Sequence, residues 1–237
     1  MTLFHCQQFS VRQQRSAMKV CTDSLLFGTM TPVKTGDRVL DIGSGCGLLA
    51  LVAAQLGAAD VTAVELCPEA CAEAADNFLN SPWAERLQAI NLSIQAFAAT
   101  GNAGRYDLII SNPPFFADHC KSALPQKRQA RHTDTLSYSD LLDAASRLLA
   151  IDGRFYVLLP SAVSPKFIPL AEEHELYLHS RMDYRGFAHT QAKVAALCFS
   201  RVAGDAESGI ITIYESANVY TAESQRYLQG FLLRFAD

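Results

Sequence analysis

The alternation of strand-like and helix-like segments constrains the fold of this chain most. Short apolar runs typical of buried strands are separated by segments whose apolar residues recur with helical spacing. The expected strands span residues 38–42, 61–65, 87–91, 106–111 and 154–159, and the expected helices span 48–56, 68–80 and 139–150, the last stopped by Asp152 and Gly153. Strands joined by helices pair in parallel, so the pattern predicts an α/β fold with helices on both faces of a mostly parallel sheet.

Two further apolar runs, residues 175–181 and 193–200, are strand-like and have only a short connection between them. A short connection suits an antiparallel hairpin, so we expect one antiparallel strand in the sheet. The hydrophobic content of 49% supports one sizeable core, and we expect a single domain over residues 1–237. Its parts are a core over 36–200, an N-terminal leader over 1–35, and an extension over 201–237 with a strand and a terminal helix.

The composition excludes several classes of protein. No run of about 18 apolar residues occurs and the start of the chain lacks a secretory signal, so we expect a cytoplasmic protein with no membrane contact. The seven cysteines are irregularly spaced, and no second pair accompanies Cys67 and Cys71, so we expect reduced thiols and no metal. A net charge of −4 leaves only a local patch for nucleic acid. The oligomeric state stays open, with a monomer favoured.

A glycine-rich turn follows the first strand of the expected sheet. Gly43, Gly45 and Gly47 come directly after Asp41, in the spacing G-x-G-x-G, and a helix begins there. Glycine lets the backbone turn tightly and approach a ligand, and ligands of such sheets bind at the carboxyl ends of the strands. A dinucleotide-binding loop needs G-x-G-x-x-G to hold a pyrophosphate, which disfavours a nicotinamide-dependent dehydrogenase. The alternative is a strand-to-helix turn that binds no ligand.

Two acidic residues indicate which ligand this turn suits. A carboxylate at Asp41 would repel a phosphate but would attract an ammonium group, such as the one on the methionine end of S-adenosylmethionine. Glu65, at the end of the next strand, can accept hydrogen bonds from both hydroxyls of a ribose. The alternative for Glu65 is a solvated acid that caps a helix.

An Asn-Pro-Pro-Phe motif, residues 112–115, follows the fourth strand. The exocyclic amino group of adenine is a poor nucleophile because its lone pair is delocalised into the ring. Two acceptors, the side-chain oxygen of Asn112 and the backbone carbonyl oxygen of Pro113, could accept hydrogen bonds from both N–H groups. These hydrogen bonds would direct the nitrogen lone pair at a methyl donor. Pro113 and Pro114 stiffen the loop, and Phe115 offers a face for stacking a flipped base. A simple turn that ends a strand is the alternative.

The glycine turn together with Glu65 resembles the cofactor site of class I methyltransferases. The Asn-Pro-Pro-Phe motif resembles that of amino methyltransferases, which act on adenine, cytosine or protein glutamine. The resemblance implies a Rossmann-like fold, S-adenosylmethionine as cofactor, and catalysis by Asn112, Pro113, Pro114 and Phe115. The cofactor-binding residues that it suggests are Lys19, Thr22 and Asp23 in the leader, Asp41, Gly43, Gly45, Glu65, Asn112, and Ser93 as the contact to the cofactor adenine unless backbone groups alone read it.

Basic residues lie beside the motif and in the leader, where a phosphate backbone could bind. The proposed RNA-binding residues are Arg12, Arg15, Lys121, Lys127, Arg128 and Arg131. The alternative is a solvated charged loop.

Longer segments favour one family. The leader, the Asn-Pro-Pro motif, residues 81–86 (Ser-Pro-Trp-Ala-Glu-Arg) and residues 125–133 together resemble the bacterial valine-tRNA adenine-37 N6-methyltransferases, while Cys21, Cys46, Phe115 and the region after Asp183 depart from them. The resemblance implies methylation of the exocyclic nitrogen of the adenine next to the valine-tRNA anticodon. Protein glutamine methyltransferases usually carry an N-terminal helical domain and DNA adenine methyltransferases a large insert, and neither is found in the sequence. These activities, an adenine in another RNA, and a non-catalytic binding module remain alternatives.

Overall fold

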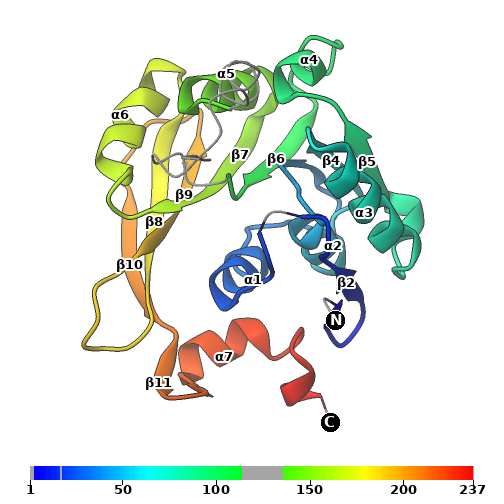
Figure 1. Cartoon of the computed structure of the whole chain (residues 1–237). Helices are drawn as coiled ribbons and strands as arrows, with labels where there is room; N and C mark the ends of the chain where they lie inside the picture. Colours follow the sequence, from blue (N-terminus) through cyan, green and yellow to red (C-terminus); the bar gives the residue numbers. More distant parts are fainter. Residues whose placement is uncertain (1–2, 17, 114–135, 237) are drawn as a thin grey trace, which may run out of the picture.

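A computed structural model describes residues 3–16, 18–113 and 136–236, and its centre is an eight-stranded sheet (Figure 1). In spatial order the strands are β10 (Glu207–Thr212), β8 (Tyr177–Arg185), β9 (Val194–Ser200), β7 (Leu149–Pro160), β6 (Tyr106–Ser111), β3 (Arg38–Ile42), β4 (Asp60–Glu65) and β5 (Leu87–Asn91). Only β9 runs antiparallel to its neighbours, and all the other pairings are parallel. The prediction of a mostly parallel sheet with one antiparallel strand is therefore confirmed.

Helices cover both faces of the sheet, as predicted (Figure 1). The helices are α1 (Thr22–Thr29), α2 (Leu48–Gln55), α3 (Pro68–Leu79), α4 (Ile94–Ala98), α5 (Tyr138–Leu148), α6 (Ser164–Glu173) and α7 (Ala222–Leu228), with short 3-10 turns η1 (Ala84–Arg86) and η3 (Leu233–Phe235). Successive side chains of a strand point to opposite faces, so Leu108 and Ile110 of β6 pack with α1, α2, α3 and α7. Ile109 packs with α4, α5 and α6 on the other side.

The boundary between α5 and β7 differs from the sequence-based expectation. The helix ends at Leu148 and the strand begins at Leu149, so Asp152 and Gly153 lie inside β7 and do not stop the helix. Gly153 is tightly packed, because a Cβ there would lie 2.7 Å from the Leu149 side chain. The pairing of β7 with β6 shifts register between Tyr106 and Leu108, which accommodates the extra residues.

The N-terminal and C-terminal extensions pack against each other. The leader begins with a hairpin of β1 (Leu3–His5) and β2 (Ser10–Arg12), and Cys6 forms a backbone bridge with Leu232. The Gln7 side chain donates hydrogen bonds to the carbonyl oxygens of Gln229 (2.7 Å) and Leu232 (2.9 Å). The C-terminal extension contains the expected strand and helix, β10 and α7, and also a small hairpin of β11 (Tyr214–Ser216) and β12 (Val219–Tyr220).

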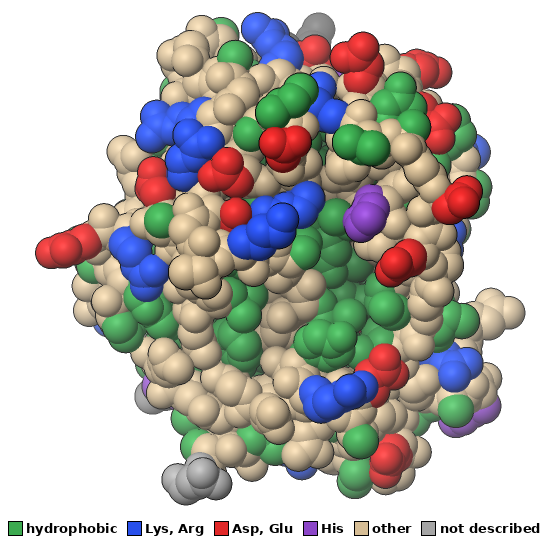
Figure 2. Space-filling model, turned by 180° about the vertical axis from the view of Figure 1, so that it is seen from behind, with side chains coloured by type: hydrophobic (Ala, Val, Ile, Leu, Met, Phe, Trp, Pro, Cys, Tyr) green, Lys and Arg blue, Asp and Glu red, His purple; other side chains and the backbone are tan. Residues whose placement is uncertain are grey.

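The surface seen from behind carries charges of both signs. Lys and Arg side chains lie among Asp and Glu side chains, around a hollow in which hydrophobic side chains gather (Figure 2). This distribution agrees with the small negative net charge of the chain. Within the described ranges, no helix has the length and apolar character needed to cross a membrane, and no group of three His, Cys, Asp or Glu residues could hold a metal ion.

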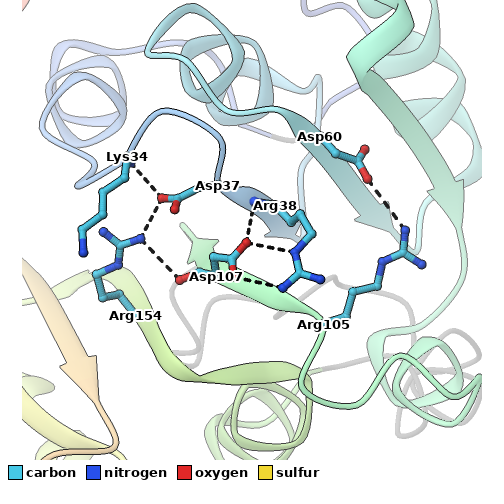
Figure 3. Close-up of polar contacts among 7 residues, drawn as sticks. All are labelled: Lys34, Asp37, Arg38, Asp60, Arg105, Asp107 and Arg154. Carbon is cyan, nitrogen blue, oxygen red and sulfur yellow. Dashed lines mark hydrogen bonds and ion pairs between the residues drawn. The ribbon is translucent and has the colours of Figure 1, made fainter.

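Ion pairs join the strands at the edge of the sheet where β3, β4 and β6 begin (Figure 3). Arg154 donates to the Asp37 carboxylate at 2.7 Å and to the carbonyl oxygen of Pro32 at 2.8 Å. Arg38 forms a two-pronged pair with Asp107, at 2.9 and 3.0 Å. The side chains of Arg154 and Asp37 are only 14% and 9% exposed, so water screens this pair far less than the others.

We expect Asp37→Ala to lower the free energy of unfolding by about 2–4 kcal/mol, because the mutation leaves the Arg154 guanidinium unpaired in a mostly buried position. Asp60→Ala is the matched control: its pair with Arg105 spans 3.7 Å and both side chains are about half exposed, so the loss should stay below about 1 kcal/mol. Urea unfolding measures both values. Equal losses for the two variants would contradict the role of the buried pair.

Candidate active site

A cavity of about 710 Å³ lies where β3, β4 and β6 end. Its wall is built from the turns that follow these strands, from the segment between β5 and α4, and from the leader. The predicted site residues on this wall are Arg15, Lys19, Asp23, Gly43, Gly45, Glu65, Ser93 and Asn112. The structure thus brings together residues that are far apart in the sequence, and it does so at the edge of the sheet where such folds bind ligands.

The glycine turn has the backbone conformation that its sequence suggests. Gly43, Gly45 and Gly47 all have positive φ, with values of 71°, 55° and 81°. At Gly47 space is also limiting, because a Cβ would lie 2.4 Å from the Phe78 ring of α3. Only glycine meets both demands, so the turn brings unobstructed backbone to the cavity.

Glu65 is held at the cavity by backbone groups on both sides. One carboxylate oxygen accepts a hydrogen bond from the N–H of Gly45 at 2.8 Å, and the other accepts one from the N–H of Cys67 at 2.8 Å. A carboxylate oxygen has more than one acceptor position, so both oxygens can still accept hydrogen bonds from a ligand. The geometry therefore leaves the predicted ribose contact available.

Asp41 does not line the cavity, in contrast to the expected direct contact with a ligand. Its side chain is fully buried, and neither oxygen has a hydrogen-bond partner of ordinary geometry in the described part of the chain. Burial raises its pKa to about 8, although the nearby N–H of Ala50 in the first turn of α2 lowers the pKa somewhat. At neutral pH the carboxyl is therefore mostly protonated, and Asp41 precedes the glycine turn in the sequence.

The three predicted leader residues have different surroundings. The Lys19 ammonium lines the cavity but donates to backbone carbonyl oxygens of its own segment, those of Gln13 and Ser16, the latter at 3.0 Å. Thr22 is not on the wall, since its hydroxyl pairs with that of Tyr214 at 2.8 Å. Asp23 does line the cavity, and burial raises its pKa while the charge of Lys193 lowers it. Asp23 thus places a carboxyl group on the cavity wall.

Asn112 lines the cavity and carries an unsatisfied acceptor. Its Oδ1 atom is buried without a hydrogen-bond partner among the described residues. The preceding Ser111 is fully buried and donates its hydroxyl to the carbonyl oxygen of Ile42 at 2.9 Å, which ties the ends of β6 and β3 together. Pro113 is buried, whereas Pro114 and Phe115 lie outside the described residues.

Ser93, the predicted contact to the cofactor adenine, lines the cavity. Its hydroxyl caps α4 by accepting a hydrogen bond from the N–H of Ala96 at 3.2 Å. Sequence reasoning missed Asn91, whose side-chain amide donates to the carbonyl oxygens of Glu65 and Leu66, both at 2.9 Å. These bonds fix the chain after β4 against the end of β5. The sequence feature that could have indicated this role is that a polar residue, Asn91, ends the apolar run of β5.

Among the predicted RNA-binding residues, Arg15 lies on the cavity wall and Arg12 is exposed on β2. Lys121, Lys127, Arg128 and Arg131 fall outside the described residues.

Glu73 of α3 anchors the leader, which was not predicted from the sequence. Its buried carboxylate accepts hydrogen bonds from the N–H groups of Gln14 (2.6 Å), Arg15 (3.0 Å) and Ser16 (3.2 Å), and from the Ser16 hydroxyl (3.0 Å). Burial would raise the pKa of Glu73, but these bonds outweigh it and the pKa is lowered. The anchored segment leads directly into the residues that line the cavity.

The topology and the position of the cavity are those of the class I methyltransferase fold. A predicted O-methyltransferase from Agrobacterium tumefaciens has a similar structure, with a TM-score of 0.69 and 15% sequence identity over 87% of this chain and 95% of that one. A ribosomal protein L11 methylase from Lactobacillus delbrueckii subsp. bulgaricus has a TM-score of 0.54 and 21% identity over 81% and 83% of the two chains. At these identities the likeness concerns the fold.

Sequence comparison gives the family. The family model described as methyltransferase small domain matches residues 16–173. A tRNA1(Val) (adenine(37)-N6)-methyltransferase from Flavobacterium psychrophilum is 38% identical over 98% of this chain and 100% of its own length. A protein of the same name from Escherichia fergusonii is 38% identical over 97% and 94%. The chain belongs to this family of tRNA1(Val) (adenine(37)-N6)-methyltransferases.

We expect Glu73→Gln to weaken binding of S-adenosylhomocysteine, the demethylated form of the methyl donor, by roughly tenfold. The mutation removes a charged acceptor and directs an amide N–H₂ at backbone N–H groups, which costs about 1.5–3 kcal/mol at the leader. The Kd from calorimetry checks this. Asp76→Asn, an exposed acid on the same helix, is the control and should bind as the wild type does; equal affinities of all three proteins would refute the anchor.

The proton on Asp41 should make the stability of the ligand-free protein depend on pH. The unfolded carboxyl ionises near its ordinary pKa of 3.8, while the folded one keeps its proton up to about 8. Between these values the unfolded state releases the proton first, so the free energy of unfolding falls as the pH rises, by at most about 1.4 kcal/mol per pH unit. Asp41→Asn should remove this contribution. Urea unfolding of both proteins across the range would show parallel profiles if Asp41 were ionised when folded.

Proposed function

We propose that the chain transfers a methyl group from S-adenosylmethionine to the exocyclic N6 nitrogen of adenine 37 in tRNA1(Val). The observation that carries the proposal is the buried Oδ1 atom of Asn112 on the wall of the cavity, which has no hydrogen-bond partner among residues 3–16, 18–113 and 136–236. A buried acceptor without a partner is costly for a protein to keep, and the amino group of a bound adenine would offer this atom a donor.

The residues of the chain supply position and polarity. Oδ1 of Asn112 and the backbone carbonyl oxygen of Pro113 each accept a hydrogen bond from one N–H of the amino group. These two hydrogen bonds draw the nitrogen lone pair out of conjugation with the adenine ring. Proline fixes the backbone at position 113, and the Ser111 hydrogen bond to Ile42 holds the start of the motif at the end of the sheet. The amino proton becomes acidic as the new bond forms, so a strong general base is not needed. The rate gain comes mainly from holding the reacting atoms in line.

The cofactor supplies an electrophilic methyl group on a sulfonium. Several residues fit it: Glu65 for the ribose hydroxyls, the glycine turn for close backbone approach, and Asp23 for the ammonium group. Ser93 and the neighbouring backbone border the adenine, and Lys19 acts by holding the leader segment. Asp41 is fully buried directly before the turn and does not line the cavity. In this proposal the leader, residues 1–35, closes over the cofactor as a part of the single domain.

The names of the relatives support tRNA as the substrate, because the sequences of these relatives align with this chain over nearly its whole length. We assign Arg12, Arg15, Lys121, Lys127, Arg128 and Arg131 to contacts with the phosphate backbone near the anticodon, where cations add affinity without reading sequence. Such an enzyme works in the cytoplasm, and we propose that it acts there as a monomer.

We expect Asn112→Ala to lower the methylation rate by about a hundredfold or more, because a lost transition-state contact of this kind costs about 3 kcal/mol. The rate is followed by nucleoside mass spectrometry on tRNA from a strain that lacks the enzyme. The affinity for S-adenosylhomocysteine should change little. Asn80→Ala, which removes an exposed amide outside the cavity, is the control. A wild-type rate in Asn112→Ala would remove the side-chain acceptor from the mechanism.

A further inference from the structure

Five aromatic rings from three segments form a continuous series at one side of the molecule. Ring centroids are 5.7 Å apart between His189 and Phe187, 5.8 Å between Phe187 and Tyr214, 5.1 Å between Tyr214 and Tyr220, and 5.9 Å between Tyr220 and Phe235. His189 is exposed and the other four side chains are partly exposed. We call this series the ring ladder.

Cations accompany the ring ladder. The Arg234 guanidinium lies 5.2 Å from the centroid of the Tyr220 ring and 5.5 Å from that of Phe235. Arg234 is exposed and forms no ion pair within the described part of the chain. Arg185 donates to the Thr212 hydroxyl at 2.8 Å, and Lys193 is exposed at the other end of the loop that carries Phe187 and His189. A surface of rings flanked by cations suits a ligand that has both flat bases and phosphates.

The middle of the ring ladder lies beside the cavity. The Tyr214 hydroxyl pairs with that of Thr22, which lies between two residues of the cavity wall, Cys21 and Asp23. Lys193 is close enough to Asp23 to affect its pKa, and the next residue, Val194, is on the wall. In Figure 1 the loop from β8 to β9, β11 and the C-terminal segment follow one side of the molecule next to α1.

An adenine whose N6 is to be methylated must leave its stack and enter the cavity. The neighbouring bases of the RNA loop then lose a stacking partner, and aromatic side chains are the usual replacement in proteins that bind unpaired RNA. The partner that fits a series of rings at the edge of the cavity is therefore single-stranded RNA on either side of the target base.

We propose that the ring ladder, with Arg234, binds the unpaired bases that flank the target adenine in the tRNA loop. The proposal rests on the proposed function for the identity of the RNA. It adds a contact surface from the C-terminal half of the chain, separate from the basic residues of the leader and of residues 121–131.

The test measures Kd for an anticodon stem-loop RNA and KM for its methylation. His189→Ala removes the exposed end of the ladder and should weaken binding by roughly fivefold to tenfold, whereas His189→Phe retains a ring and should bind as the wild type does. Arg234→Gln should weaken binding by a similar factor and reduce the slope of log Kd against log salt by about 0.7. Arg226→Gln is the control. Arg226 is an exposed cation on α7 that contacts no aromatic ring in the described part of the chain, so its replacement should not weaken binding through lost stacking.

Abasic RNAs make the test specific. An RNA without the base on one side of the target should bind weakly to the wild type, and His189→Ala should add little further loss on that RNA, because both changes remove the same contact. Unchanged Kd and KM in His189→Ala and Arg234→Gln, with S-adenosylhomocysteine affinity showing both variants folded, would overturn the proposal and leave the rings to a protein partner or to packing alone. If the wild type methylates no tRNA adenine, the proposed function fails, while the binding data still decide on the ring ladder.

Discussion

The parallel pairing of β3 with β4 on one side and β6 on the other is the constraint on which the site depends. It places the ends of three strands next to one another, so that the glycine turn, Glu65 and Asn112 meet although they are far apart in the chain. Two hydrogen bonds fix this edge: the N–H of Gly43 donates to the carbonyl oxygen of Val64 at 2.9 Å, and the Ser111 hydroxyl donates to that of Ile42 at 2.9 Å. A change of register by one residue would turn these side chains to the wrong face.

The cavity is not made by the sheet alone, since the leader forms one of its sides. Glu73 holds that leader through backbone N–H groups, and Lys19 does so through backbone carbonyl oxygens. In both cases a charged side chain orders a segment that has little regular structure. The affinity for the cofactor should therefore depend on Glu73, which does not line the cavity.

The sequence predicted the core well where local signals agree. Each expected strand of the core is present, and the G-x-G-x-G turn and the Asn-Pro-Pro motif fall at the ends of strands as expected. The prediction was wrong at Gly153, because a glycine in a strand and a glycine after a helix look the same in sequence. The burial of Asp41, the pairing of Thr22 with Tyr214 and the anchor at Glu73 could not be predicted, since each depends on contacts between distant segments. The helix α6 was missed because prolines at its start and within it disguise the helical pattern.

The bridge between Cys6 and Leu232 has a consequence for the order in which the protein forms. The outer edge of the first hairpin finds its backbone partner only in the last few residues of the chain. During synthesis from the N-terminus, the sheet can assemble while the hairpin still lacks this partner. Closing so long a loop is slow compared with forming local contacts. The leader side of the cavity should thus gain its full order only after Leu232 has been synthesised.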